Sequence, residues 1–137
     1  MTTQEYLQAR KRKDWKFNRV VKENAFLSVN RIHPIKQKTV AQIVEQAKKD
    51  NTVKRIIIFG GSTRYDCDYT SDLDICIDWK ENCYDRDGVL KPFTRNMRKQ
   101  ISTITKGCAD VVNYDYLDGT VVEDAVKDGV VVYEYDV

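Results

Sequence analysis

Two aspartates separated by one residue are the groups in this sequence best placed to do chemistry. Asp72 and Asp74 lie in the stretch SDLDICIDW, residues 71–79. Side chains two residues apart on a β-strand point to the same face, so the two carboxylates would project side by side. Proteins hold Mg²⁺ through one or two carboxylates together with substrate phosphates. The pair therefore predicts a magnesium site.

A glycine turn precedes this pair. Gly60, Gly61 and Ser62 follow directly on the apolar run IIIF, residues 56–59. Two glycines permit a sharp turn and close approach of the backbone to a ligand. If Ser62 begins a short helix, its free N–H groups and the helix dipole favour an anion in the turn. Phosphate on these amides and Mg²⁺ on the carboxylates together indicate a site for a nucleoside triphosphate.

Arg64 is the first cation after the glycine turn. Its guanidinium could bind an oxygen of the triphosphate. An exposed salt bridge to Asp66 or Asp68 is the alternative. We interpret Asp78 differently from Asp72 and Asp74, because it lies further along the same strand and is expected at the rim of the site.

The order of these motifs resembles the DNA polymerase β-like nucleotidyltransferase superfamily, whose signature is a strand, Gly-Ser, a short spacer and Asp-x-Asp. The resemblance covers roughly residues 39–135. Gly61-Ser62 leaves nine residues before Asp72 and Gly60-Gly61 leaves ten, so both remain candidates for the Gly-Ser position. The family adds a third acidic residue on a later strand, and Asp110 in the stretch CADVV matches it.

The resemblance implies nucleotidyl transfer, in which an acceptor hydroxyl attacks the α-phosphorus of a nucleoside triphosphate and pyrophosphate leaves. Asp72 and Asp74 would hold the Mg²⁺ of the triphosphate, and Asp110 would complete a second Mg²⁺ site near the acceptor oxygen. An acid among apolar residues on a short strand needs such a partner. Gly60, Gly61, Ser62 and Arg64 would bind the nucleotide.

The short chain is similar to minimal nucleotidyltransferase antitoxins, which in studied members transfer AMP from ATP to a tyrosine of a HEPN-type toxin. This similarity implies a HEPN-type toxin or another protein as the acceptor. Two alternatives stay open. The chain could be a degenerate nucleotidyltransferase-fold binding module, or a transferase that acts on a small molecule or RNA.

The elements that must position these groups follow from hydrophobic periodicity. We expect an α/β (α+β) fold, with a small mixed β-sheet of the nucleotidyltransferase type and helices packed on it. Expected strands cover residues 53–59, 71–79, 108–112 and 130–135. Expected helices begin at two capping boxes, Thr39 with Gln42 and Thr120 with Glu123, and at Pro92.

The N-terminal part of the chain is strongly basic. Residues 1–38 contain ten Lys/Arg and three Asp/Glu, whereas the remainder contains thirteen and eighteen. We therefore divide the chain into a basic N-terminal helical arm, residues 1–38, and a nucleotidyltransferase domain, residues 39–137. The arm, with a helix expected over residues 3–28, is either a surface for nucleic acid or an acidic partner, or a solvated helix that caps the domain. His33-Pro34 is interpreted as a structural break.

Length and composition bound the remaining possibilities. The chain has 137 residues, of which 42% are hydrophobic and 32% charged, as expected for one globular domain. No apolar run is long enough to cross a bilayer, and the basic N-terminus lacks the apolar core of a signal peptide. Four scattered cysteines predict free thiols in a reducing compartment. The sequence therefore predicts a cytoplasmic protein with no membrane partner.

Overall fold

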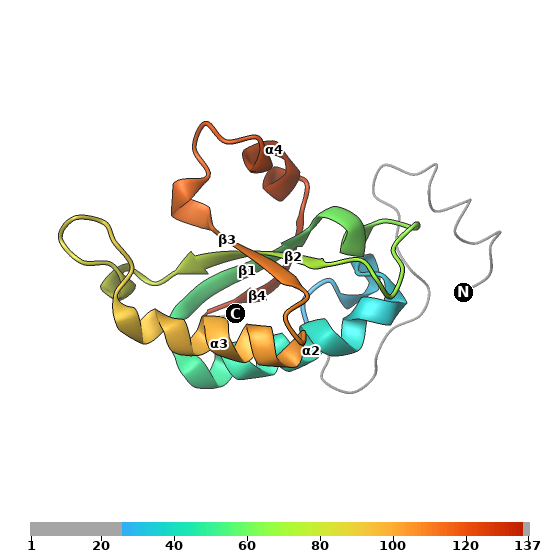
Figure 1. Cartoon of the computed structure of the whole chain (residues 1–137), viewed down its shortest axis with the longest axis horizontal. Coiled ribbons are helices and arrows are strands. Elements are labelled where there is room, and N and C mark those ends of the chain that lie inside the picture. The colour runs from blue at the N-terminus through green and yellow to red at the C-terminus, as the bar shows by residue number, and fades with distance from the viewer. Residues whose placement is uncertain (1–25, 136–137) are drawn as a thin grey trace.

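A four-stranded mixed β-sheet forms the centre of the molecule, in a computed structural model that describes residues 26–135 (Figure 1). The strand order is β3-β2-β1-β4. β1 pairs antiparallel with β2 and β4, and β2 pairs parallel with β3. The strands are β1 (Val53–Phe59), β2 (Leu73–Trp79), β3 (Ala109–Asn113) and β4 (Val130–Glu134). The predicted α+β class with a mixed sheet is confirmed.

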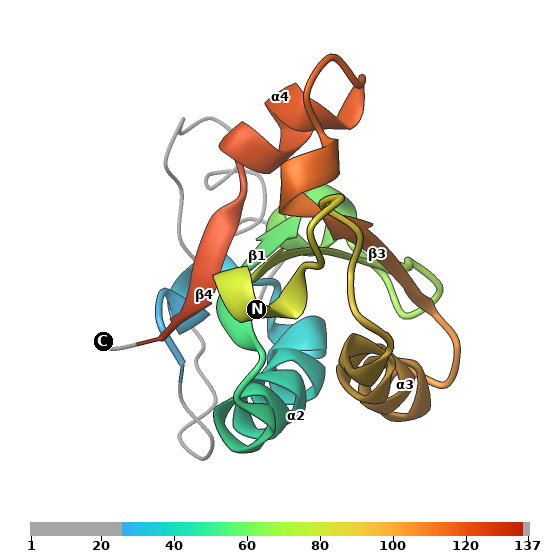
Figure 2. The ribbon, with the colours of Figure 1, turned by 90° about the vertical axis from the view of Figure 1, so that its left-hand side faces the viewer.

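Helices cover both faces of the sheet (Figure 2). Two of them, α2 (Pro34–Asp50) and α3 (Arg95–Ile104), lie side by side against one face. The opposite face carries the shorter α4 (Val122–Lys127) and the 3₁₀ turn η5 (Tyr114–Tyr116). Further 3₁₀ turns are η1 (Val29–Arg31), η2 (Gly60–Thr63), η3 (Glu81–Cys83) and η4 (Pro92–Thr94).

The main core lies between the sheet and the pair α2 and α3. The alternating residues of β2 supply much of it, since Leu73, Ile75, Ile77 and Trp79 are at most 2% exposed. Full burial of an aliphatic side chain contributes about 1.5–3 kcal/mol. The predicted apolar face of β2 is confirmed, and it fixes which way the alternate residues Asp74, Cys76 and Asp78 must point.

The second face of the sheet is also covered by apolar side chains. Ile57 and Phe59 of β1 pack with Cys76, and with Leu117 and Val126 above the sheet, in a smaller apolar cluster. Phe59 pairs with Asp74 at one end of this cluster. The carboxylate of Asp74 therefore stands at the edge of a packed layer.

The start of α2 differs from the prediction. The helix begins at Pro34 and not at Thr39, with His33 as N-cap. The Nδ1 atom of His33 accepts a hydrogen bond from the backbone N–H of Ile35 at 3.2 Å. Proline suits the first helical position because its missing N–H would have no partner there. Pro34 therefore starts a helix, and the residue 38/39 boundary falls inside α2.

The predicted capping box at Thr120 is also wrong. The hydroxyl of Thr120 donates to the carbonyl of Leu117, and the N-cap of α4 is Val121. Glu123 still reaches back, but its carboxylate accepts the backbone N–H of Gly119 at 3.2 Å. By contrast, Pro92 does initiate a helical segment, as a 3₁₀ turn that leads into α3.

The described residues bear only on part of the predicted N-terminal arm and on the four cysteines. Residues 1–25, most of the expected basic arm, lie outside the described residues, and residues 26–33 contain the turn η1. Among the helices between residues 26 and 135, none has the length and apolar content to cross a membrane.

All four cysteines are free, and Cys67, Cys76 and Cys83 are buried whereas Cys108 is exposed. Burial raises the pKa of the Cys76 thiol to about 12.

Candidate functional site

The three predicted carboxylates gather at one end of strands β2 and β3. Asp74 and Asp110 are register partners in the parallel pair, on strands about 4.8 Å apart. Asp72 lies just before β2 begins. Burial raises the pKa of the Asp74 carboxyl, and the charges of Asp110 and Asp72 raise it further. Three acids that repel one another at one place are suited to bind cations.

The glycine turn lies directly against Asp74. Gly60 has a φ of +70°, a conformation that glycine adopts without cost, and a methyl group at this position would overlap the Oδ2 atom of Asp74. Gly61 has no atom within 4 Å of the place of a side chain. Its backbone amide and the Arg64 guanidinium lower the pKa of Asp74, against the effects of burial and the other acids. The turn is therefore part of the same site.

Ser62 is placed differently from its neighbours in the turn. Its side chain is fully buried, and its hydroxyl has no hydrogen-bond partner among the described residues. The 3₁₀ turn ends at Thr63, whose hydroxyl donates to the Gly60 carbonyl at 2.8 Å. The turn thus meets Asp74 at Gly60 and at the backbone amide of Gly61, while the Ser62 hydroxyl is buried.

Arg64 is exposed and near enough to Asp74 to affect its ionisation. No ion pair joins Arg64 to Asp66 or Asp68 in the described part of the chain. Asp68 instead accepts hydrogen bonds from Thr70, which close the loop before Asp72. The guanidinium is left available beside the carboxylates.

The first turn of α2 contacts both the glycine turn and the segment that carries Asp72. The backbone N–H of His33 donates to the carbonyl of Ser62 at 2.8 Å, in the glycine turn. The Nζ atom of Lys36 donates to the carbonyl of Ser71 at 2.6 Å, directly before Asp72. Lys36 could not be found from the sequence, because these contacts join residues far apart in the chain and no local spacing indicates them.

Asp78 is not at the rim, as we expected, but is buried at the far end of β2. It forms an ion pair with Arg55 of β1 at 3.3 Å, and the two residues are register partners. The Arg55 guanidinium also lies 4.7 Å from the centre of the Tyr114 ring. Burial raises the pKa of Asp78, while Arg55 lowers it. Asp78 therefore pairs with Arg55 on the second face of the sheet and does not join Asp72, Asp74 and Asp110.

The three carboxylates suit a metal ion that takes some of its ligands from the substrate. Within residues 26–135, no group of three His, Cys, Asp or Glu side chains is already arranged as a metal site. Mg²⁺ does not require such a cage, because it keeps waters and substrate phosphates as ligands beside one or two carboxylates. Asp72, Asp74 and Asp110 offer only oxygen atoms, which is the donor type that Mg²⁺ prefers.

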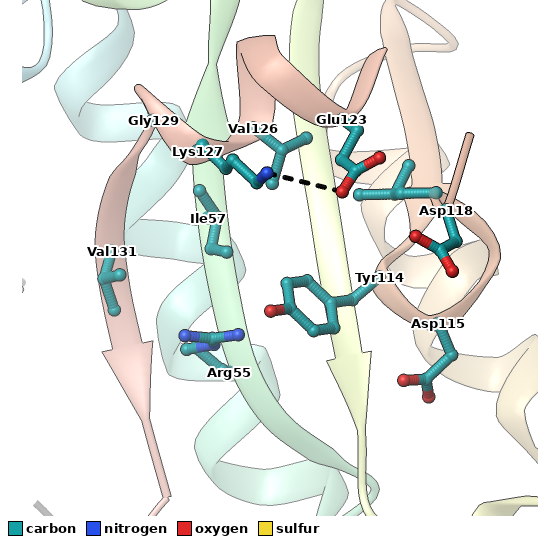
Figure 3. A pocket seen from close by; sticks show the side chains of 11 residues that line it. Arg55, Ile57, Tyr114, Asp115, Asp118, Glu123, Val126, Lys127, Gly129 and Val131 are labelled. Atoms are coloured by element: carbon teal, nitrogen blue, oxygen red, sulfur yellow. Dashed lines mark ion pairs between the residues drawn. The ribbon is translucent and has the colours of Figure 1, made fainter. Parts of the chain in front are cut away.

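A cavity of about 490 Å³ opens on the same face of the sheet (Figure 3). Its floor includes Ile57 of β1 and Val131 of β4, and its far wall is formed by η5 and α4. No local sequence pattern indicates this cavity, since its walls come from four separate elements.

A mixed sheet with paired acids beside a glycine turn defines a protein of the nucleotidyltransferase class. Comparison with known families agrees: the profile described as "Polymerase beta, Nucleotidyltransferase" matches residues 41–137. The chain therefore belongs to this family, and the resemblance seen in the sequence is confirmed. No curated protein and no solved structure matches the chain.

Proposed function

We propose that this protein transfers a nucleoside monophosphate, AMP from ATP, to a hydroxyl group of a partner protein in a Mg²⁺-dependent reaction. The placement of Asp72, Asp74 and Asp110 beside the Gly60-Gly61 turn carries the proposal. In this reaction the acceptor oxygen forms a bond to the α-phosphorus, and the bond from that phosphorus to the bridging oxygen of pyrophosphate breaks. Positioning and neutralisation of charge are the main demands on the protein.

Each part of the site has a role. Asp72 and Asp74 would hold the cation that accompanies the triphosphate, and Asp110 would help to hold a second cation for the acceptor oxygen. The backbone of Gly60 and Gly61 and the guanidinium of Arg64 contact the triphosphate. Bound Mg²⁺ would neutralise the phosphate charge that grows during transfer.

The partner and the compartment belong to the same proposal. A HEPN-type toxin is the protein acceptor that the resemblance to antitoxins suggests. The four free cysteines support a reducing cytoplasm. The basic arm of residues 1–38 adds nucleic acid as a further proposed partner, which salt-dependent RNA binding lost on deletion of residues 1–30 would support.

Label transfer tests the proposal directly. The protein is incubated with Mg²⁺, with ATP labelled at the α-phosphate and with the proteins that co-purify with it. Transfer that is lost in Asp72→Asn and kept in Asp87→Asn, an exposed loop acid, supports the proposal. Absence of label on any protein or small molecule, with the wild type, contradicts it.

A non-catalytic binding module is the second candidate, and the buried hydroxyl of Ser62 favours it. A phosphate site that has lost its serine hydroxyl would bind a nucleotide less tightly. In this case Asp72→Asn would leave partner binding intact, and no label would be transferred by any variant.

A further inference from the structure

The cavity on the second face of the sheet has the construction of a ligand site. Its volume of about 490 Å³ lies within the range of small-molecule pockets. Ile57 and Val131 give it an apolar floor, Val126 adds an apolar side chain from α4, and charged side chains form its rim (Figure 3). An apolar body with a few polar groups around it is the usual composition of such pockets.

The cavity lies on the same sheet face as the carboxylates. Ile57 precedes Phe59 by two residues on β1, and Phe59 pairs with Asp74. Two residues along a strand span about 7 Å. None of the three carboxylates lines the cavity, so a molecule held there would have to extend past Phe59 to present a hydroxyl group to Asp74.

The cations of the cavity already have partners. Arg55 is ion-paired with Asp78, and Lys127 is ion-paired with Glu123 at 3.4 Å (Figure 3).

Two carboxylates on the rim of the cavity have no ion pair within the described residues. These are the carboxylates of Asp115 and Asp118. The uncompensated charge of the cavity is therefore negative. A triphosphate would be repelled, whereas a cation would be attracted.

We propose that this cavity binds an ammonium or guanidinium group of the acceptor, and so selects acceptors that carry positive charge next to the reacting hydroxyl. That the bound molecule is an acceptor rests on the proposed function, whereas the binding of a cation does not. The cationic group can belong to a basic side chain of an acceptor protein or to a small polyamine, and the experiment separates these sources. A polyamine would occupy the cavity without being an acceptor, because it has no hydroxyl group.

Binding is measured by NMR without nucleotide or Mg²⁺, so that its outcome is independent of catalysis. The probes are spermidine, a lysine–tyrosine–lysine tripeptide, a glutamate–tyrosine–glutamate tripeptide and adenosine. We expect the basic probes to shift the methyl signals of Ile57, Val126 and Val131, and the acidic tripeptide to leave them unchanged. Binding of the basic tripeptide identifies a protein source, and binding of spermidine alone identifies a polyamine.

Charge reversal on the rim provides the matched control. Asp118→Lys should weaken binding of the basic probe by about fivefold or more, since a local charge is replaced by a repelling one. Asp124→Lys makes the same change in net charge on the exposed part of α4, outside the cavity lining, and should weaken it much less. Asp72→Asn should bind the probe like the wild type.

Three results would overturn the inference: no shift at millimolar probe, equal weakening by Asp118→Lys and Asp124→Lys, or adenosine displacing the basic probe from the cavity. Label transfer to a partner could persist in each of these cases, and it would then be the acceptor assignment alone that fails. Conversely, a protein that binds the basic probe but transfers no label refutes the proposed function and keeps the cation site.

Discussion

The ammonium group of Lys36 donates a hydrogen bond to the backbone carbonyl of Ser71, and Ser71 directly precedes Asp72. The same helical turn binds the carbonyl of Ser62 through the backbone of His33. Helix α2 thus fixes the distance between the glycine turn and the carboxylates. This helix therefore positions the site in addition to packing on the sheet.

Removing this contact should affect the site more than the fold. Lys36→Met should lower kcat/KM for ATP by about 10- to 100-fold, because a displacement of Asp72 by 1 Å can have an effect of this size. The free energy of unfolding should fall by only about 1–2 kcal/mol. Transfer kinetics and urea denaturation measure the two effects. Lys38→Met, an exposed change on the same helix, should alter neither quantity, and a loss of activity in both variants would contradict a positioning role for Lys36.

The two neighbouring glycines should respond oppositely to substitution. Gly60→Ala introduces a side chain at φ +70° and against Oδ2 of Asp74. We expect it to lower the free energy of unfolding by about 1–2 kcal/mol or more and to abolish transfer. Gly61→Ala meets open space and should stay within about 0.5 kcal/mol of the wild type. Equal tolerance at both positions would show that the turn does not approach Asp74 as described.

His33, the one histidine in the sequence, should make stability depend on pH. Burial lowers its pKa from 6.5, and the charge of Lys36 lowers it further. A lowered pKa in the folded state means that the unfolded chain binds protons more readily, so stability is full above 6.5 and falls as the pH drops below that value. His33→Asn keeps an N-cap acceptor without titrating in this range. Denaturation curves at several pH values should show that the free energy of unfolding falls below pH 6.5 for the wild type only. An identical dependence of this free energy on pH in the variant would exclude His33 as its source.

The strands and the acidic pair could be predicted because their signals are local. The run IIIF and the alternation of Leu73, Ile75 and Ile77 each encode burial within a few residues. Long-range contacts account for what was missed. Arg55 covers Asp78 only because β1 and β2 pair in one particular register, and Lys36 reaches Ser71 across 35 positions of sequence.

The starts of two helices were missed for a different reason. Thr39 and Thr120 both match capping boxes in sequence, but the helices begin elsewhere. At Pro34 the fixed φ of proline and the imidazole of His33 form an earlier start, so the local motif at Thr39 lies inside the helix.

Mg²⁺ together with ATP should stabilise the protein. Burial and, after it, the charges of Asp110 and Asp72 raise the pKa of Asp74, and a cation bound among the three acids would relieve the repulsion between them. A ligand at 100 times its dissociation constant adds about 2.7 kcal/mol to the free energy of unfolding. Thermal melts should show a higher Tm with both components present. The increase in Tm should be smaller in Asp72→Asn. An equal increase in this variant would show that the nucleotide binds away from the three acids.

The unequal exposure of the four cysteines offers a way to observe the site at work. Cys67, Cys76 and Cys83 are inside the protein, while Cys108 stands at the surface two positions before Asp110. A thiol-reactive fluorophore should consequently attach at one location without any prior mutagenesis. Its emission would report, in real time, the arrival of whatever molecule approaches the third carboxylate.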